Sequence, residues 1–328
     1  MTTKVRINKY DNLKGLAIIL IVLGHLDYLD VMNPFFISRF FFMIDLPVFF
    51  FVAGYFSKIA ADQPIKSFKR LMVPYFLFCL LIEVFRFVYL GSTNWAMIFL
   101  QSSMAMWFLI ALFAMKMLLP ILDKLKYPLI IALIAAVFVG IYDVHPNLLA
   151  VSRTFSYLPI FLLGFYFNSY KEYFSKAHSK LYAFYDKYFY IITVLVILAT
   201  IVVTIKFNGK FFVFKTPYAG NLLYEAIKKF IVLVLEIMWV IILNRVMTNR
   251  ECFLTKLGRN SMAIYVLHPF IYYTFKPVWP TMISSPTISI VLSLILTAIT
   301  VFILSRDIVT VYLNKFTDGV FNIFFNPV

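Results

Sequence analysis

Charged residues are scarce in this 328-residue chain, at 14% of the total, whereas soluble domains carry about 25%. Acidic residues are the rarer kind, since 15 Asp and Glu stand against 30 Lys and Arg. A water-soluble fold cannot be built from this composition, because too little polar surface is available to face water. Nucleic-acid binding and extended disorder are therefore excluded as explanations of the formal net charge of +15.

Cysteine is nearly absent as well. The two that occur are Cys79, within an apolar run, and Cys252, in a polar connection, so we expect neither a disulfide nor a cysteine-based metal site. The chain also lacks the GxxxxGK[ST] loop of P-loop enzymes, the HExxH zinc motif and the GxSxG elbow of serine hydrolases. ATP-driven, zinc-peptidase and serine-hydrolase functions have no support, and no metal is expected.

Apolar residues make up most of the chain, with 62% hydrophobic residues and a mean hydropathy of +0.89. A hydrocarbon core about 30 Å thick requires about 20 apolar residues per helix. Continuously apolar runs favour helices, because a lipid-exposed backbone must satisfy its own hydrogen bonds. The ten candidate spans are Leu13 to Val31, Phe35 to Phe56, Leu71 to Leu90, Met106 to Leu122, Pro128 to Tyr142, Leu148 to Phe167, Tyr188 to Ile205, Leu222 to Leu243, Ser261 to Phe275 and Ile288 to Ser305.

The connections between these runs are unequally basic. With the N-terminus in the cytoplasm, most Lys and Arg residues fall in cytoplasmic loops, as the positive-inside rule requires. The first apolar run is too long, and its leader too polar, for a cleaved signal peptide. We predict an all-α, multi-pass helix bundle in the plasma membrane with both termini cytoplasmic. Its single domain, 1–328, comprises an N-terminus (1–12), a ten-helix bundle (13–305) and a C-terminal tail (306–328).

Lys14 and His25 form the most informative pair. An ionisable residue at the centre of a membrane helix costs about 2.5–3.5 kcal/mol, so each one is a candidate functional residue. The two are eleven residues apart, which places them on one helix face with about 16 Å of rise between them. Lys14 can meet a phosphate at the cytoplasmic mouth, while neutral His25 can accept a proton deeper in the membrane. The alternative is a snorkelling lysine and a structural histidine.

The other intramembrane ionisable residues have plain structural alternatives. Glu83 and Arg86 stand at i and i+3, where they can neutralise each other. Arg153, near the outer side, can bind an anionic sugar or a developing oxyanion, or can anchor its helix at the interface. Asp27 can orient a histidine or mark the outer end of its helix. His268 precedes a proline, so it is either a second base or a residue that stabilises a helix kink.

Five segments resemble the membrane-bound acyltransferase-3 family, and they occur in the same order along the chain. They extend from Asp11 to about Phe270 and read DNLKGLAIILIVLGHL, FFMIDLPVFFFVAGY, KRLMVPY, MWFLIALF and GRNSMAIYVLHPF. The resemblance implies O-acylation of an exported glycan, with the acyl group drawn from cytoplasmic acetyl-CoA or a similar acyl-CoA. It also implies a stand-alone form, because the chain ends soon after its tenth span, without an appended esterase-like domain.

The resemblance assigns roles to individual residues. It implies that His25 is catalytic and that Lys14, in place of the usual arginine, helps to bind the acyl donor. Lys69 and Arg70 match the basic residues before the PY element and are expected to bind the same donor. Trp107 matches the fourth-helix tryptophan and is expected to bind substrate.

The second predicted helix departs from the family pattern. Phe42 stands where relatives often have a histidine, and Asp45 interrupts the spacing between FFM and LP. Its role is therefore left open.

Residues and resemblance together predict a membrane O-acyltransferase that uses Lys14, Arg70 and His25 on a glycan or lipid-linked sugar. Asp27, Glu83, Arg86 and His268 would support the site. The expected partners are the acceptor, membrane lipids and glycan-synthesis proteins, and no nucleic acid. The main alternative is a transporter or flippase for lipid-linked sugars or organic anions, with a path through Glu83, Arg86, Glu236 and His268. A scaffold for glycan synthesis is poorly motivated, since it needs no aligned lysine and histidine.

Overall fold

The computed structural model describes residues 6–27, 36–91, 95–101, 104–141, 148–169, 179–207, 209–212, 214, 217–218, 220–282 and 285–325. Every regular element in these segments is a helix. The longer helices are α1 (Asn8–Asp27), α5 (Val73–Leu90), α6 (Trp107–Leu122), α7 (Pro128–Phe138), α8 (Val151–Phe165), α11 (Phe189–Lys206), α13 (Leu222–Val246), α15 (Ser261–Phe275), α17 (Pro286–Leu304) and α18 (Asp307–Phe324). Shorter ones are α2 (Phe36–Phe42), α3 (Asp45–Tyr55), α4 (Gln63–Ser67), α10 (Ser179–Lys187), α12 (Gly209–Phe212), α14 (Phe253–Arg259) and α16 (Trp279–Met282).

Each of the ten predicted spans coincides with helix in the structure, which confirms the all-helical class. Within the described residues, six helical segments are long and apolar enough to cross a membrane: Ser38–Tyr55, Gln63–Leu90, Met104–Leu122, Leu148–Phe165, Phe189–Lys206 and Thr287–Leu304. Pro128–Ile141 is apolar but shorter. Ten crossings and the cytoplasmic location of both termini remain predictions.

The second predicted span is two helices, not one. The chain turns at Met43 and Ile44 between α2 and α3. Pro47 has no N–H and disfavours helical conformation in the residue before it, which favours a new helix start at this point. Asp45 begins α3, and its Oδ1 accepts a hydrogen bond from the Leu46 N–H at 2.5 Å. That bond satisfies one of the donors that a helix N-terminus leaves unpaired.

The third predicted span starts earlier than expected. Helix runs without a break from Gln63 to Leu90, through a π-helical turn at Phe68–Met72 that carries Lys69 and Arg70. Pro74 follows this turn and lacks the N–H that would continue the ladder of hydrogen bonds. A π turn absorbs such a mismatch within an otherwise continuous helix. The two basic residues therefore lie on a rigid element and not in a loop.

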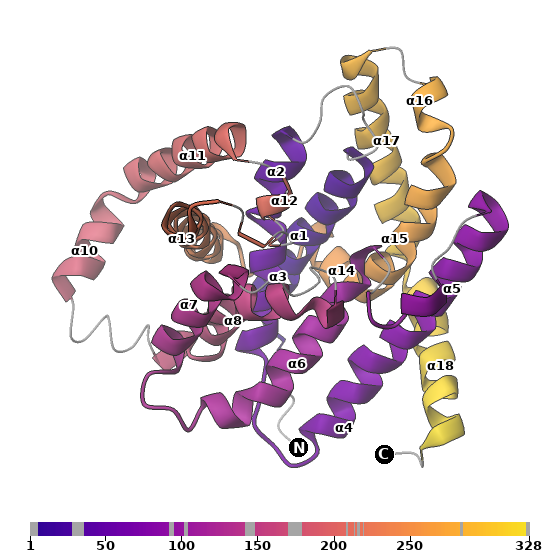
Figure 1. The fold of residues 1–328 in the computed structure, drawn as a ribbon, viewed down its shortest axis with the longest axis horizontal. Coiled ribbons are helices and arrows are strands. Elements are labelled where there is room, and N and C mark those ends of the chain that lie inside the picture. The colour runs from indigo at the N-terminus through magenta and orange to yellow at the C-terminus, as the bar shows by residue number, and fades with distance from the viewer. Residues whose placement is uncertain are drawn as a thin grey trace.

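α1 lies in the middle of the bundle and contacts α3, α14, α15 and α17 (Figure 1). Its closest neighbour is α14, which it meets through two glycines. A Cβ at Gly15 would lie 2.1 Å from the Leu254 carbonyl oxygen, and one at Gly258 would lie 1.8 Å from that of Asp11. Only glycine permits backbones to approach this closely. The register of α1 against α14 is therefore set by backbone contact.

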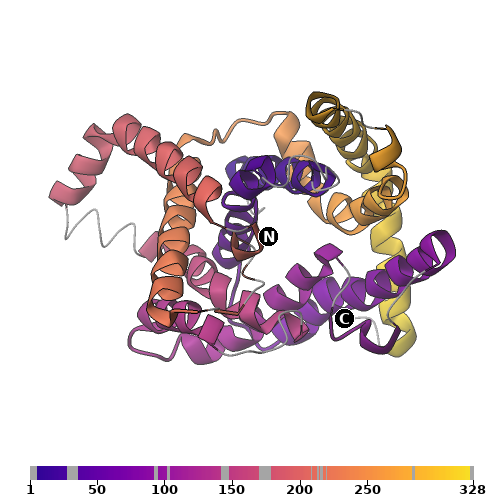
Figure 2. The same ribbon diagram turned by 45° about the horizontal axis from the view of Figure 1, so that its top comes forward.

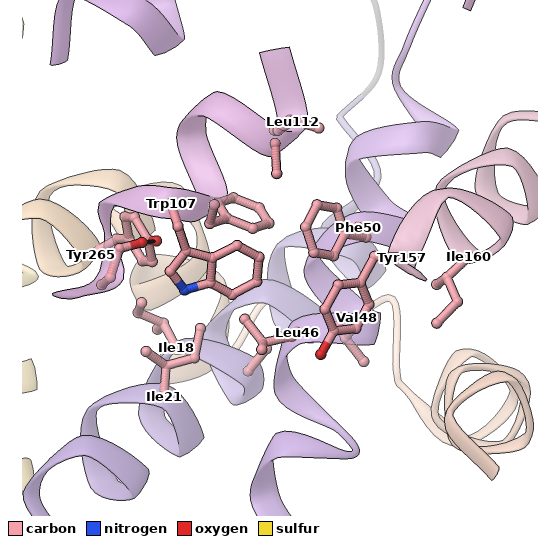
Figure 3. Close-up of a cluster of buried hydrophobic side chains, with 14 of the residues drawn as sticks. Ile18, Ile21, Leu46, Val48, Phe50, Trp107, Leu112, Tyr157, Ile160 and Tyr265 are labelled. Carbon is pink, nitrogen blue, oxygen red and sulfur yellow. Dashed lines mark hydrogen bonds between the residues drawn. The ribbon is translucent and has the colours of Figure 1, made fainter. Parts of the chain in front are cut away.

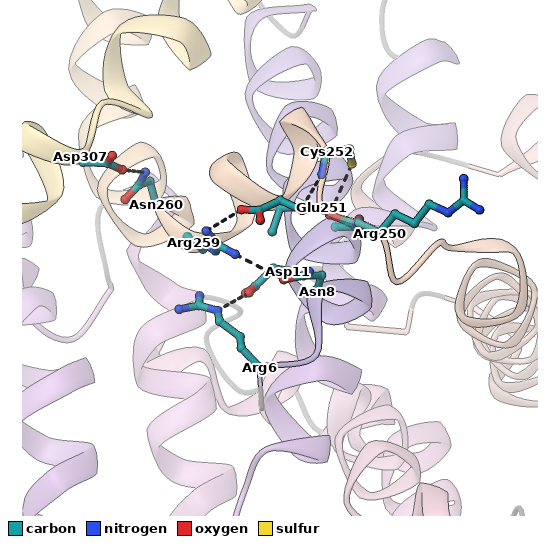
Figure 4. Close-up of polar contacts among 11 residues, drawn as sticks. Arg6, Asn8, Asp11, Arg250, Glu251, Cys252, Arg259, Asn260 and Asp307 are labelled. Atoms are coloured by element: carbon teal, nitrogen blue, oxygen red, sulfur yellow. Dashed lines mark hydrogen bonds and ion pairs between the residues drawn. The ribbon is translucent and has the colours of Figure 1, made fainter. Parts of the chain in front are cut away.

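Polar contacts hold the start of α1 in the same place. The Asn12 side-chain amide donates to the Thr248 and Arg250 carbonyl oxygens at 2.9 and 3.0 Å, and its oxygen accepts from the Thr255 hydroxyl at 2.5 Å. Beside it, Arg259 pairs with Glu251 at 2.8 Å (Figure 4). Because Asn12 is fully buried, these bonds meet the requirement that buried polar groups be paired.

The predicted C-terminal tail forms α18, which packs beside α5 (Figure 2). Asn260 joins it to the bundle, since its amide donates to the Ser305 carbonyl oxygen and to Asp307 Oδ1, both at 2.8 Å. Farther along α18, Asp318 pairs with Lys69 at 3.0 Å. This pair brings the end of α18 to the π turn.

Candidate functional site

A cavity of about 440 Å³ opens between α1, α3, the α4–α5 segment and α6. Five cations line it: Lys14, Lys58, Lys66, Arg70 and Lys116. No carboxylate is among the described residues that line it, so the wall facing a ligand is strongly basic. A preformed concave site with few, convergent charges is the usual form of a ligand pocket.

Lys14 is anchored at the edge of this cavity by an acidic neighbour. Its Nζ lies 2.9 Å from Asp11 Oδ1. The other oxygen, Asp11 Oδ2, lies 2.5 Å from Arg6 Nε (Figure 4). Burial acts to raise the pKa of Asp11, but Arg6 and Lys14 outweigh it and hold that pKa below its ordinary value. Asp11 therefore stays ionised and orients Lys14 toward the opening.

Lys116 is a cavity residue that the sequence did not single out. It lies within α6, where its Nζ donates to the Ser57 hydroxyl at 2.9 Å. Nor does the sequence single out Lys58 and Lys66, which line the same cavity. Within the described part of the chain, no carboxylate is paired with Lys58, Arg70 or Lys116. These three cations are thus the ones available to an anion.

The wall of the cavity away from these charges becomes apolar and reaches Tyr265 and Phe108. Tyr265 is on α15, one turn before His268, and the centroids of the two rings are 6.0 Å apart. The Tyr265 hydroxyl donates to the Ala105 carbonyl oxygen, which holds its ring in place. Neither histidine lines the cavity itself, and Tyr265 is the lining residue that contacts His268.

His25 and His268 are in direct contact, although 243 residues separate them. His25 Nδ1 lies 2.8 Å from His268 Nε2, and the rings are nearly parallel, 11° apart, with centroids 5.0 Å apart. His268 is buried, at 2% exposure, whereas His25 is half-buried. On its other side, His268 Nδ1 lies 3.2 Å from the Ile264 carbonyl oxygen. A half-buried imidazole held by a buried one is a geometry suited to proton transfer.

Trp107 and Arg153, both predicted to bind substrate, are also in contact. The Arg153 guanidinium carbon lies 4.4 Å from the centre of the Trp107 ring, and both side chains are buried. Trp107 in turn stacks on Tyr157, with 6.1 Å between centroids, and lies between Tyr157 and Tyr265 (Figure 3). A desolvated cation over a tryptophan face is stabilised by about 2 kcal/mol. Arg153 is thus a packed residue of the core and not an exposed anchor.

Other predicted residues lie apart from this arrangement. Lys69 lines a second cavity of about 570 Å³, which shares Lys66 and Arg70 with the first, and there it pairs with Asp318 at 3.0 Å. Glu83 and Arg86 pair with each other at 2.7 Å on α5, which agrees with the alternative that they neutralise each other. Asp27 ends α1, and its side chain lies outside the described residues. Among the described residues, no group of three His, Cys, Asp or Glu could hold a metal ion.

A comparison with protein families covers nearly the whole chain. A model of the acyltransferase-3 family, described as an acyltransferase domain, matches residues 7–306. The chain belongs to the acyltransferase-3 family. The match confirms the resemblance carried by the five segments, and with the apolar helices it makes the chain a multi-pass membrane acyltransferase. No curated protein and no solved structure matches it.

The position of Asp45 in this acyltransferase was not anticipated. Asp45 is fully buried at the start of α3, and its Oδ2 has no hydrogen-bond partner among the described residues. Glu236 on α13 is also fully buried, with both oxygens unpartnered in the described segments. In the sequence, both residues are notable only as carboxylates within apolar runs, where burial in a membrane is costly.

Proposed function

We propose that this acyltransferase moves an acetyl or similar acyl group from cytoplasmic acyl-CoA to a hydroxyl of an exported or cell-surface glycan. The observation that carries the proposal is the 440 Å³ cavity, which has cations at one end and Tyr265 at the other. Coenzyme A has the complementary chemistry, since its nucleotide end carries phosphates and its pantetheine arm ends in the thioester.

The residues present fit such a donor. Arg70 can form bidentate hydrogen bonds with a phosphate, and Lys58 and Lys116 can act as point charges beside it. Lys14, oriented by Asp11, adds a fourth cation at the same opening. His25 is three helical turns farther along α1, about 16 Å away along the helix axis, a distance that an extended pantetheine arm can span.

The transfer step itself needs a base. His25 accepts the proton of the acceptor hydroxyl, whose oxygen then attacks the thioester carbonyl carbon. The C–S bond breaks as the new C–O bond forms, and the coenzyme A thiolate leaves and is protonated by the histidinium. Arg153, which lies over the buried Trp107 ring, can supply a positive charge that stabilises a developing oxyanion.

The test is release of the coenzyme A thiol by purified protein in vesicles that contain acetyl-CoA and a glycan acceptor. His25→Ala should insert and fold but release no thiol above background. Leu23→Ala provides a matched control, because Leu23 is a half-buried residue on the same helix and should retain activity. Wild-type rates in the His25→Ala protein would refute the mechanism. Substrate counterflow without consumption of acetyl-CoA would instead support a transporter.

A further inference from the structure

His25 and His268 share a hydrogen bond, and a third group shows which of the two histidines is the donor. A neutral imidazole carries one N–H donor and one acceptor nitrogen. His25 Nδ1 and His268 Nε2 are 2.8 Å apart, so one of the two nitrogens carries a hydrogen and the other accepts it. The same geometry allows both assignments until the far side of His268 is considered.

The Ile264 carbonyl oxygen resolves this choice. It lies 3.2 Å from His268 Nδ1, and a carbonyl oxygen can only accept, so His268 Nδ1 must carry the hydrogen. In the neutral ring His268 Nε2 is then an acceptor. His25 Nδ1–H therefore donates to it, which leaves His25 Nε2 unprotonated. The opposite assignment would place two acceptors face to face at Ile264 and would leave a buried nitrogen unsatisfied.

We propose that His268 is a positioning residue that holds His25 in the tautomer whose Nε2 accepts the acceptor hydroxyl's proton. This rests on the proposed acyl-transfer function. When His25 Nε2 takes the proton, its Nδ1–H becomes a charge-assisted donor to His268, and the Ile264 carbonyl stabilises the His268 N–H behind it. The histidinium then gives its Nε2 proton to the departing thiolate, so both histidines are neutral again at the end of the step.

The fold holds His268 firmly enough for this role. His268 is buried on α15, the helix that continues from α14, and α14 meets α1 through the close contacts of Gly15 and Gly258. The ring also packs 6.0 Å from Tyr265, at the apolar end of the cavity. A histidine that served only a helix kink would need its contact with Ile264 but not the one with His25.

The tautomer can be measured without any enzymatic activity. The chain has four histidines, so replacing His145 and His178 with Gln leaves the pair alone for ¹⁵N-histidine magnetic resonance in bilayers. We expect both remaining rings to carry the hydrogen on Nδ1. A His25 ring with its hydrogen on Nε2 would overturn the proposal, whatever the protein's activity.

Kinetics of two replacements test the consequence for transfer. His268→Gln keeps a carbonyl acceptor near the position of Nε2, whereas His268→Phe fills the space without one. We expect His268→Phe to lower kcat by roughly 10²-fold or more, the scale of lost general-base catalysis, with the KM for acetyl-CoA unchanged. His268→Gln should retain activity within about tenfold of wild type, and His25 should keep its hydrogen on Nδ1.

A packing role would give the reverse order, with His268→Phe at least as active as His268→Gln, and that result would refute the proposal. Thermal unfolding of each variant verifies that it is folded before its rate is compared. The acyl-transfer proposal and the tautomer proposal can fail separately. Absence of thiol release from the wild-type protein would refute acyl transfer, whereas the ¹⁵N spectra test the His25 tautomer without reference to activity.

Discussion

The contact of Gly258 with the backbone of α1 allows a prediction with a magnitude. A Cβ at this position would lie 1.8 Å from the Asp11 carbonyl oxygen, and ordinary contact begins at 3.4 Å. Gly258→Ala therefore requires two backbones to separate by about 1.6 Å. Overpacking of this kind costs about 1–3 kcal/mol, since neither helix can yield as a side chain would.

Separation of α1 from α14 should also reach the two histidines. α14 continues into α15, which carries His268, and the contact between His25 and His268 is 2.8 Å. A hydrogen bond is lost beyond about 3.5 Å, so a shift of this size is enough to break it. We expect Gly258→Ala to lower both the unfolding temperature and the rate of acyl transfer.

Gly319→Ala is the matched control, because Gly319 lies inside α18 and a Cβ there would meet nothing within 4 Å. Alanine stabilises a helix interior by roughly 0.5–1 kcal/mol over glycine, so this variant should unfold at or above the wild-type temperature. Thermal unfolding in detergent and thiol release measure both effects. If Gly258→Ala unfolds no lower than wild type and transfers at the wild-type rate, the backbone contact does not set the register of α1.

Three further changes test separate parts of the molecule. Arg70→Ala should raise the KM for acetyl-CoA roughly tenfold or more, since a hydrogen bond to a charged group is worth about 1.5–3 kcal/mol. Lys126→Ala is the control and should leave the KM unchanged, because Lys126 is exposed and lies outside the cavity. Initial rates of thiol release measure both variants, and equal effects on the KM would contradict the assignment. Glu83→Ala should lower the unfolding temperature because it leaves the Arg86 guanidinium without its partner, and a second change, Arg86→Leu, should recover part of the loss; no recovery would argue against mutual neutralisation. The lowered pKa of Asp11 stabilises the fold above its unfolded value of about 3.9, and this is lost as the pH falls through the folded-state pKa. The gap in unfolding temperature between wild type and Asp11→Asn should therefore be full at neutral pH and close on acidification, and a gap independent of pH would count against the pairing.

Much of the fold followed from local chemistry alone. Apolar runs and the demands of a lipid-exposed backbone predicted ten helices, and helix occurs in each of these ten places. Hydropathy could not show the break at Met43 and Ile44, because both residues are apolar and the run continues through them. Hydropathy also could not show that Lys69 and Arg70 lie on a helical turn, because a polar segment has low hydropathy whether or not its backbone is helical.

The candidate site was only half visible in the sequence. Lys14 and His25 share one helix, so the helical period was enough to place them on one face. Lys116 was overlooked, because a single lysine near the end of an apolar run is indistinguishable from a cytoplasmic anchor. Lys69 and Arg70 are neighbours in sequence, yet only Arg70 lines the basic cavity. Arg70 also lines the second cavity beside Lys69, and which cavity a cation lines is decided by the neighbouring helices.

The sequence by itself determined that the chain is a helical membrane protein, that its charge is concentrated in the connections, and that its segments follow the acyltransferase-3 pattern. These properties depend on composition and on the spacing of residues along single helices, and both can be obtained directly from the sequence. Only the tertiary structure decided that His268 meets His25 and that Arg153 covers Trp107. Both contacts join residues on separate helices, and the local sequence does not encode how separate helices approach each other. For α1 and α14 that approach includes the backbone contact of Gly258 with Asp11.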